Sequence, residues 1–228
     1  MRDWINGTTV DPVVFERWPE YRLVLVAAEL VDTTALAVFA ERLHAQACDA
    51  VRAIGSGEPD AHTVRWHAAY RDFGIKPRVA RPSVDALVRR AASDNGLPRI
   101  NVLVDLYNAI SILHRVPIGG EDLDHYEGPA RLILASGDEP FHTAADGVPI
   151  VDHAEPGEPV WIDGVGITCR RWNWRQTSRT AIHADTVRVG FIIDSLDAPD
   201  HHGAELAAAQ LAELLPDPQL RTIDTSTR

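Results

Sequence analysis

The densest cluster of side chains able to do chemistry is the segment CRRWNWRQTSRT, residues 169–180. Its candidates for substrate binding are Arg170, Arg171, Trp172, Trp174 and Arg175. An arginine guanidinium holds a phosphate through two hydrogen bonds, and a tryptophan ring offers a face on which a nucleic-acid base stacks. Because four arginines within ten residues repel one another, the segment predicts an anionic ligand among them.

Two amides in the same segment, Asn173 and Gln176, are candidate catalytic residues. An amide N–H can stabilise the oxyanion that develops when an ester is hydrolysed. If the segment is a strand, residues 171, 173 and 175 share one side, and the two tryptophans share the other with Gln176. The alternative is that the tryptophans belong to the core and the arginines pair with the surplus of acidic residues.

A second polar group lies in the apolar stretch INVLVDLYNAISILHR, where Asn101, Asp105 and Asn108 follow at spacings of four and three. In a helix these residues share one face. Asp105 is the third catalytic candidate, which would orient a water molecule or bind an amino group, and Asn101 and Asn108 are substrate-binding candidates. The alternative is that the three residues cap neighbouring loops.

Positive charge also gathers between Arg65 and Arg90, where seven basic residues stand against two acidic ones. If this stretch lies beside the segment 169–180, the two form a positive cleft. The alternative is a solvated helix face with exposed loop arginines.

Several common sites have no sequence signature. The chain lacks an HExxH or HxH pattern, a GxSxG elbow, a phosphate-binding glycine loop and a dinucleotide fingerprint. Cys48 and Cys169 are far apart, which favours two reduced thiols. We therefore expect neither a metal site nor a cofactor.

The positions of the candidates depend on the elements that carry them. Residues 21–30 predict a buried strand, and apolar spacing predicts a long helix that ends at Ile54. Further helices are expected from His62, from an N-cap at Ser83, and over about 100–114 and 202–215, and a loose tail follows the last of them. From Asp122, short apolar runs separated by turns predict strands. The pattern indicates an α+β fold: a single domain with a mixed β-barrel or sheet and packed helices.

Composition limits the setting in which this fold acts. The chain has 228 residues, 45% of them hydrophobic, and a formal net charge of −11. Its pI is about 5.3, which argues against a uniformly positive nucleic-acid-coating surface. The N-terminus lacks the pattern of a signal peptide, and no apolar run approaches the length of a membrane span. We expect a cytoplasmic protein with no membrane partner.

Several ordered segments resemble one known family. FGIKPRVARPSVDALVRRAASDNGLPRINVLVDLYNAISILHRVPIGGEDLD is similar to the first half of the B3/B4 module of the phenylalanyl-tRNA synthetase beta subunit. The segments EGPARLILASGDEPFHT, GEPVWID and CRRWNWRQ are similar to its second half. The resemblance implies a free-standing B3/B4-like domain over residues 61–200. A supporting strand and helix occupy 1–60, and a C-terminal helix and tail occupy 201–228.

Within the synthetase, this module removes a wrong amino acid, notably tyrosine, from tRNA. The resemblance implies tRNA binding and a hydrolase that deacylates mischarged tRNA, with an aminoacyl-tRNA or a tRNA acceptor end as partner. Gly119 or Gly120 stands where the synthetase often has a histidine, and residues 172–180 contain no acid where the synthetase supplies one. The alternative is a non-catalytic module that binds a free amino acid or the acceptor end.

Overall fold

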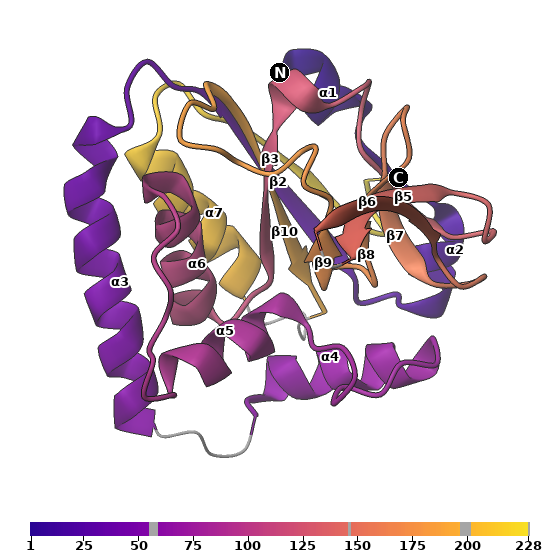
Figure 1. Ribbon diagram of the computed structural model, residues 1–228, viewed down its shortest axis with the longest axis horizontal. Coiled ribbons are helices and arrows are strands. Elements are labelled where there is room, and N and C mark those ends of the chain that lie inside the picture. Colours follow the sequence, from indigo (N-terminus) through magenta and orange to yellow (C-terminus); the bar gives the residue numbers. More distant parts are fainter. Residues whose placement is uncertain (55–58, 146, 197–201, 228) are drawn as a thin grey trace.

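A computed structural model describes residues 1–54, 59–145, 147–196 and 202–227. The chain folds into a four-stranded sheet, a five-stranded sheet, a two-stranded ribbon and packed helices (Figure 1). The α+β expectation is confirmed, with open sheets.

The four-stranded sheet is antiparallel and has the order β11-β2-β10-β3. Its strands are β2 (Arg22–Glu29), β3 (Ile118–Asp122), β10 (Arg188–Ser195) and β11 (Gln219–Ile223). The two central strands, β2 and β10, are apolar and buried on both faces. Successive residues along each strand therefore belong in turn to two hydrophobic cores, one on each face of the sheet. In β10, Phe191 and Ile193 belong to one core and Ile192 to the other.

Helices cover one face of this sheet, on the left of Figure 1. They are α3 (Thr34–Ile54), α6 (Val102–His114) and α7 (Gly203–Leu214), and α5 (Ser83–Ala91) packs against α3 and α6. In α3, Leu36, Leu43 and Val51 are buried at helical spacing, as the sequence predicts. α6 ends at Arg115 in the left-handed conformation, and Pro117 follows.

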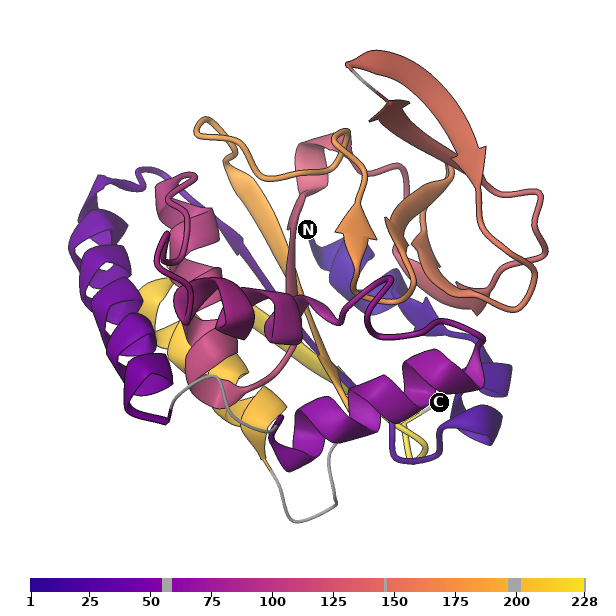
Figure 2. The ribbon, with the colours of Figure 1, turned by 60° about the horizontal axis from the view of Figure 1, so that its bottom comes forward.

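The five-stranded sheet has the order β1-β4-β7-β8-β9. Its strands are β1 (Thr9–Val10), β4 (Arg131–Leu134), β7 (Pro159–Ile162), β8 (Ile167–Arg170) and β9 (Arg175–Gln176). Two short helices, α1 (Arg2–Gly7) and α2 (Pro12–Arg17), flank β1. The ribbon of β5 (Pro140–Ala145) and β6 (Val148–His153) extends from the body in Figure 2.

An aromatic core joins the five-stranded sheet to the second face of the four-stranded sheet. It includes Trp18, Tyr21 and Trp172, together with Trp66 of α4 (Ala61–Asp72). The ring of Trp172 lies 4.8 Å from Trp18 and 5.1 Å from Trp66, measured between centroids. This contact fixes the segment 171–174 relative to both sheets.

Two sequence expectations were wrong in detail. The tail is not loose, because residues 219–223 form β11 and pair with β2 from Leu23 to Ala27. Ser83 is not the N-cap of α5, because it is the first helical residue, and its hydroxyl makes no hydrogen bond to any residue that the structure describes.

Candidate functional site

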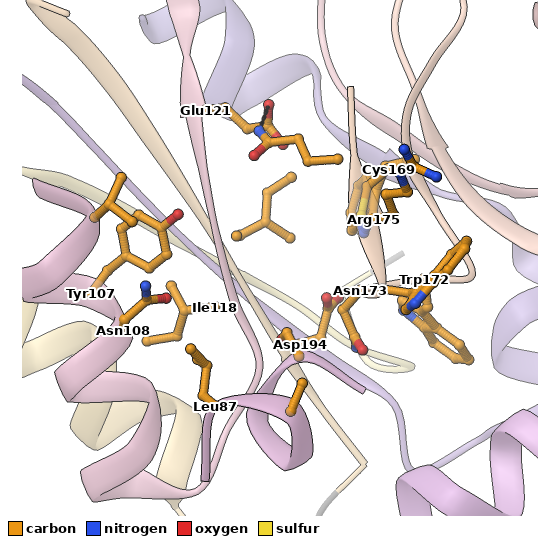
Figure 3. A pocket seen from close by; sticks show the side chains of 18 of the residues that line it. Leu87, Tyr107, Asn108, Ile118, Glu121, Cys169, Trp172, Asn173, Arg175 and Asp194 are labelled. Atoms are coloured by element: carbon orange, nitrogen blue, oxygen red, sulfur yellow. Dashed lines mark hydrogen bonds between the residues drawn. The ribbon is translucent and has the colours of Figure 1, made fainter. Parts of the chain in front are cut away.

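A pocket of about 290 Å³ lies between the two large sheets and beside α5 and α6. The four-stranded sheet contributes residues of β3 and β10, and the five-stranded sheet contributes residues of β7, β8 and β9. Because segments from residue 83 to residue 194 line it, the pocket exists only in the folded chain. Figure 3 shows side chains of residues that line this space.

The pocket walls are largely apolar and aromatic. They are formed by Leu87, Val104, Tyr107, Ile118, Trp161, Trp172, Trp174 and Ile192. A few polar side chains join them, the usual composition of a small-molecule site. The space suits a compact ligand with an apolar body.

Glu121 of β3 is a buried carboxyl group in this lining. Gln176 Nε2 donates a hydrogen bond of 2.7 Å to its carboxylate and another of 2.8 Å to the Gly120 carbonyl. Burial raises the pKa of the Glu121 carboxyl to about 8, and the hydrogen bond from Gln176 opposes part of this rise. Glu121 can therefore exchange a proton near neutral pH.

Asp194 of β10 is a second buried carboxyl group, on the side of the pocket near Asn173 and Trp172 (Figure 3). The Tyr21 hydroxyl donates a hydrogen bond of 2.6 Å to it. Burial raises the pKa of the Asp194 carboxyl to about 7, against the opposing effect of the Tyr21 hydroxyl and of the Asn173, Trp172 and Trp161 N–H groups that lie beside it. The pocket thus contains two carboxyl groups that titrate near neutral pH.

The segment 171–174 is a tight turn between β8 and β9, so the expected strand alternation was wrong. Arg171 and Trp172 have φ values of 50° and 67°, in the left-handed region that few non-glycine residues adopt. This backbone directs the Trp172 ring into the aromatic core and leaves one side of Trp172 and Trp174 in the pocket lining.

Two of the predicted phosphate-binding arginines lie outside the pocket lining. Arg170 is buried and holds Glu158 through two hydrogen bonds of 2.6 and 2.9 Å, and it also pairs with Asp152. Arg171 lies 4.1 Å from the centre of the Trp174 ring. The contacts of Arg170 match the alternative in which the arginines pair with acidic residues, and Arg171 Nε also lies 3.9 Å from Glu158 Oε2.

The exposed Arg175 lines the pocket with Asn173, Trp174 and Gln176, and Arg90 of α5 is a second exposed arginine there. No ion pair holds Arg90 or Arg175 in the part of the chain that the structure describes. These two side chains place positive charge at the exposed part of the pocket.

The polar stripe of α6 divides between two roles. Asn101 caps the helix by accepting a hydrogen bond of 2.9 Å from Val104 N, and Asp105 accepts one of 2.9 Å from Ile100 N. Neither residue lines the pocket, whereas Asn108 does. The structure therefore does not bring Asp105 together with Asn173 and Gln176.

The two glycines at the place of the synthetase histidine differ in their surroundings. A Cβ atom on Gly119, which lines the pocket, would have no neighbour within 4 Å. On Gly120 it would lie 2.7 Å from both Tyr107 Cε1 and Ile182 Cδ1. Only Gly119 has space for a side chain.

Sequence reasoning missed Glu121, Asp194 and Trp161. A signal for Asp194 was present, because an acidic residue ends the apolar run VGFIID of a buried strand. Glu121 follows IGG and stands one residue before the region in which the sequence predicts strands. Neither position shows by itself that its carboxyl group lies in a pocket.

The described ranges contain neither a metal-binding cluster nor a membrane-spanning helix. No group of three or more His, Cys, Asp or Glu side chains there is arranged to hold a metal ion. None of the helices there has the length and apolar character needed to cross a membrane.

Comparisons with known proteins place this geometry in context. Residues 65–212 match the model of the B3/4 domain. A search of curated proteins found no significant match. The crystal structure of an N-terminal fragment of the phenylalanyl-tRNA synthetase beta-subunit from Pyrococcus horikoshii is similar, with a TM-score of 0.46 and 12% sequence identity. The similarity covers 94% of this chain and 50% of that one, so the chain spans about half the length of the fragment.

Proposed function

Since this chain belongs to the B3/4 domain family, we propose that it binds the aminoacyl end of tRNA and hydrolyses the ester of a mischarged tRNA. The observation that supports this most is the combination found in one pocket. Apolar walls surround a buried Glu121 with a raised pKa. Arg90 and Arg175, which form no ion pair with any described residue, lie at the exposed part of the pocket.

Each part of the pocket has a role in this proposal. The amino-acid side chain packs against the apolar wall that includes Leu87 and Ile118. Arg90 and Arg175 bind the phosphate of the terminal nucleotide, and the half-buried Trp174 stacks on its base.

Hydrolysis requires a positioned water molecule, a base to accept its proton and donors for the oxyanion. Glu121 accepts the proton, because a base is most effective when its pKa lies near the working pH. Among the described residues, no acceptor lies in close hydrogen-bonding geometry with the Asn173 amide nitrogen, which donates to the oxyanion. The Gln176 amide is already bonded to Gly120 and Glu121, so its role is to hold Glu121 in position.

The direct test is a deacylation assay on a panel of mischarged tRNAs. The wild-type protein should accelerate hydrolysis of at least one of them, and the rate should rise with pH until it levels off above about pH 8, as Glu121 ionises. Glu121→Gln should lower the rate about 100-fold or more. Glu155→Gln, which changes an exposed glutamate outside the pocket lining, is the matched control and should retain the wild-type rate.

One result would count against hydrolysis and another against the role of Glu121. If no tRNA in the panel is deacylated faster than in buffer, the enzyme assignment fails. If charged tRNA still binds in that case, the protein is a non-catalytic binding module for the acceptor end. A wild-type rate in Glu121→Gln would remove Glu121 from the mechanism.

A further inference from the structure

The part of the pocket wall around Asp194 is built from donors that converge on this one carboxyl group. Asp194 is 2% exposed, and the Tyr21 hydroxyl donates a hydrogen bond of 2.6 Å to it. The indole N–H groups of Trp161 and Trp172 and the side-chain amide of Asn173 lie beside the same carboxyl group (Figure 3). Because these side chains are buried, the Asp194 carboxyl is the acceptor available to all of them.

The four donors come from separate parts of the fold. Tyr21 precedes β2, Trp161 lies on β7, and Trp172 and Asn173 belong to the turn between β8 and β9, whereas Asp194 lies on β10. An ionised carboxylate has about four lone-pair positions and no donor, so it can accept from all four groups. A protonated carboxyl group brings an O–H of its own among these donors. The ionised form therefore matches this wall.

The turn 171–174 needs such support, because part of its backbone is strained. Arg171 and Trp172 have φ values of 50° and 67°, and residues held in this region persist only where their surroundings fix them. Two hydrogen bonds of 2.7 Å hold the backbone of the turn, from Trp172 N to the Pro159 carbonyl and from the Tyr70 hydroxyl to the Arg171 carbonyl. Asp194 holds the turn from the pocket side, through the side chains of Trp172 and Asn173.

The amide of Asn173 is fixed from both ends. Its Oδ1 lies 3.1 Å from the Tyr70 hydroxyl, and its Nδ2 lies beside Asp194. An amide nitrogen carries two N–H groups, so one can face Asp194 while the other serves a ligand in the pocket that Asn173 lines. The direction of the second N–H then depends on the first.

We propose that the ionised Asp194 carboxylate is a positioning group, which holds the turn 171–174 and, through Asn173, aims the oxyanion donor of the hydrolysis. The part that concerns the oxyanion rests on the proposed function, whereas the hold on the turn needs no tRNA. When Asp194 takes up a proton, its O–H competes with the surrounding N–H groups. The turn then loosens and the donor loses its direction.

Titratable and charged groups from several elements lie near Asp194 or share its pocket. They are Tyr21 before β2, Tyr70 on α4, Arg90 on α5, Glu121 on β3, Cys169 on β8, Arg171 in the turn and Arg175 on β9. Arg22 of β2 pairs with Glu205 of α7 at 2.6 Å, and His62 on α4 accepts a hydrogen bond from Leu196 N.

Among these groups, Glu121 titrates closest to Asp194. Burial raises the pKa values of Tyr21, Tyr70 and Cys169 well above their ordinary values, so these groups stay neutral up to about pH 8.5. The pKa of Glu121 is about 8, against about 7 for Asp194. A test of Asp194 therefore needs a Glu121 variant as its control.

The first measurement uses the full chain without tRNA and follows the indole N–H signals of Trp161 and Trp172 by NMR over about pH 6 to pH 8.5. Both signals should shift together, with a midpoint near pH 7. In Tyr21→Phe the midpoint should move upward, because the lost hydrogen bond stabilises the ionised form. Tyr126→Phe removes a hydroxyl that bonds to Thr168 instead, and this matched control should leave the midpoint unchanged.

Two variants assign this titration. Asp194→Asn should abolish it, and Glu121→Gln should keep it. In the deacylation assay, Asp194→Asn should lower kcat about tenfold or more while KM stays within about twofold, because the oxyanion forms only in the transition state. Below pH 7, the slope of log kcat against pH should approach about 2 in the wild type, where two carboxyl groups must ionise, and about 1 in Asp194→Asn.

Several results would overturn the proposal. They are a wild-type protein whose two indole signals do not titrate, a folded Asp194→Asn that keeps the titration, a Glu121→Gln that loses it, and an unchanged midpoint in Tyr21→Phe. A wild-type kcat in Asp194→Asn would overturn it as well. If no tRNA is deacylated while the indole signals titrate as expected, the proposed function fails and the hold of Asp194 on the turn stands.

Discussion

At the scale of single residues, the function of a carboxyl group in this protein follows from its partners. Asp105 accepts a backbone hydrogen bond from Ile100 and a bond of 3.4 Å from Arg99, and it stabilises the start of α6. Glu121 and Asp194 are each 2% exposed, and no cation pairs with either of them in the described part of the chain. Burial without a cation raises their pKa values and makes them available for proton exchange.

Gly119 and Gly120 offer a residue-scale prediction about space. Gly120→Ala should destabilise the protein by about 1–3 kcal/mol, because its Cβ would overlap the rigid Tyr107 ring. Gly119→Ala is the matched control and should leave stability within about 0.5 kcal/mol, since its Cβ would enter open space. Chemical denaturation of both variants measures this, and equal stability of the two would contradict the close approach of β3 to α6.

At the scale of elements, the pocket depends on how α5 is attached. Asp85 of α5 is buried and accepts hydrogen bonds from His67 of α4 at 3.0 Å, from Arg81 at 3.1 Å and from Arg89 at 2.8 Å. Since α5 supplies Leu87 and Arg90 to the pocket, this network fixes one of its walls.

The Asp85 network predicts how stability depends on acid. Burial by itself raises the pKa of the Asp85 carboxyl, but the bonds from His67, Arg81 and Arg89 outweigh this effect and lower the pKa from 3.8 to about 2. The stabilisation, about 2 kcal/mol, is therefore fully present above pH 4 and is lost as the pH falls toward 2.

Denaturant titrations between pH 2 and pH 7 test this. Asp85→Asn should be less stable than wild type at pH 7, and the difference should shrink as the pH approaches 2. Asp138→Asn, at an exposed aspartate outside the network, is the control. A difference that stays constant with pH would show that the Asp85 charge contributes nothing.

At the scale of the whole molecule, the net charge of −11 is unevenly distributed. Arg71, Lys76 and Arg78 line a second hollow of about 540 Å³ on the connection between α4 and α5. All three side chains are exposed, and no ion pair holds them within the described residues. The hollow adds positive charge on the segment that leads into the pocket helix α5.

If tRNA binds as proposed, this hollow contacts phosphates beyond the terminal nucleotide. The triple variant Arg71→Ala, Lys76→Ala, Arg78→Ala should bind tRNA more weakly and reduce the slope of log affinity against log salt by about 2. Arg52→Ala on α3, where Arg52 pairs with Asp49, should leave the slope unchanged. Filter binding between 50 and 200 mM salt, about the range over which phosphate contacts weaken strongly, measures both. An unchanged slope in the triple variant would exclude the hollow from the tRNA contact.

The sequence by itself determined the elements whose periodicity is complete within one segment. The strands β2 and β10 and the helices α3 and α6 follow from apolar spacing, because that spacing matches the repeat of each element. The ordered family-like segments between Phe73 and Gln176 also indicated the B3/4 family, which the match over residues 65–212 shows. Six predicted site residues line the pocket: Asn108, Trp172, Asn173, Trp174, Arg175 and Gln176.

Only the tertiary structure decided which partner each polar group meets. Arg170 pairs with Glu158, which lies on the connection between β6 and β7. Asn101 caps its own helix, α6, whereas Tyr21 donates a hydrogen bond to Asp194, 173 positions further along the chain. Spacing describes the few residues around a position, whereas burial and pairing depend on segments that come together in the fold. For this reason the two carboxyl groups of the pocket, Glu121 and Asp194, became visible only once β3, β7 and β10 were placed around it.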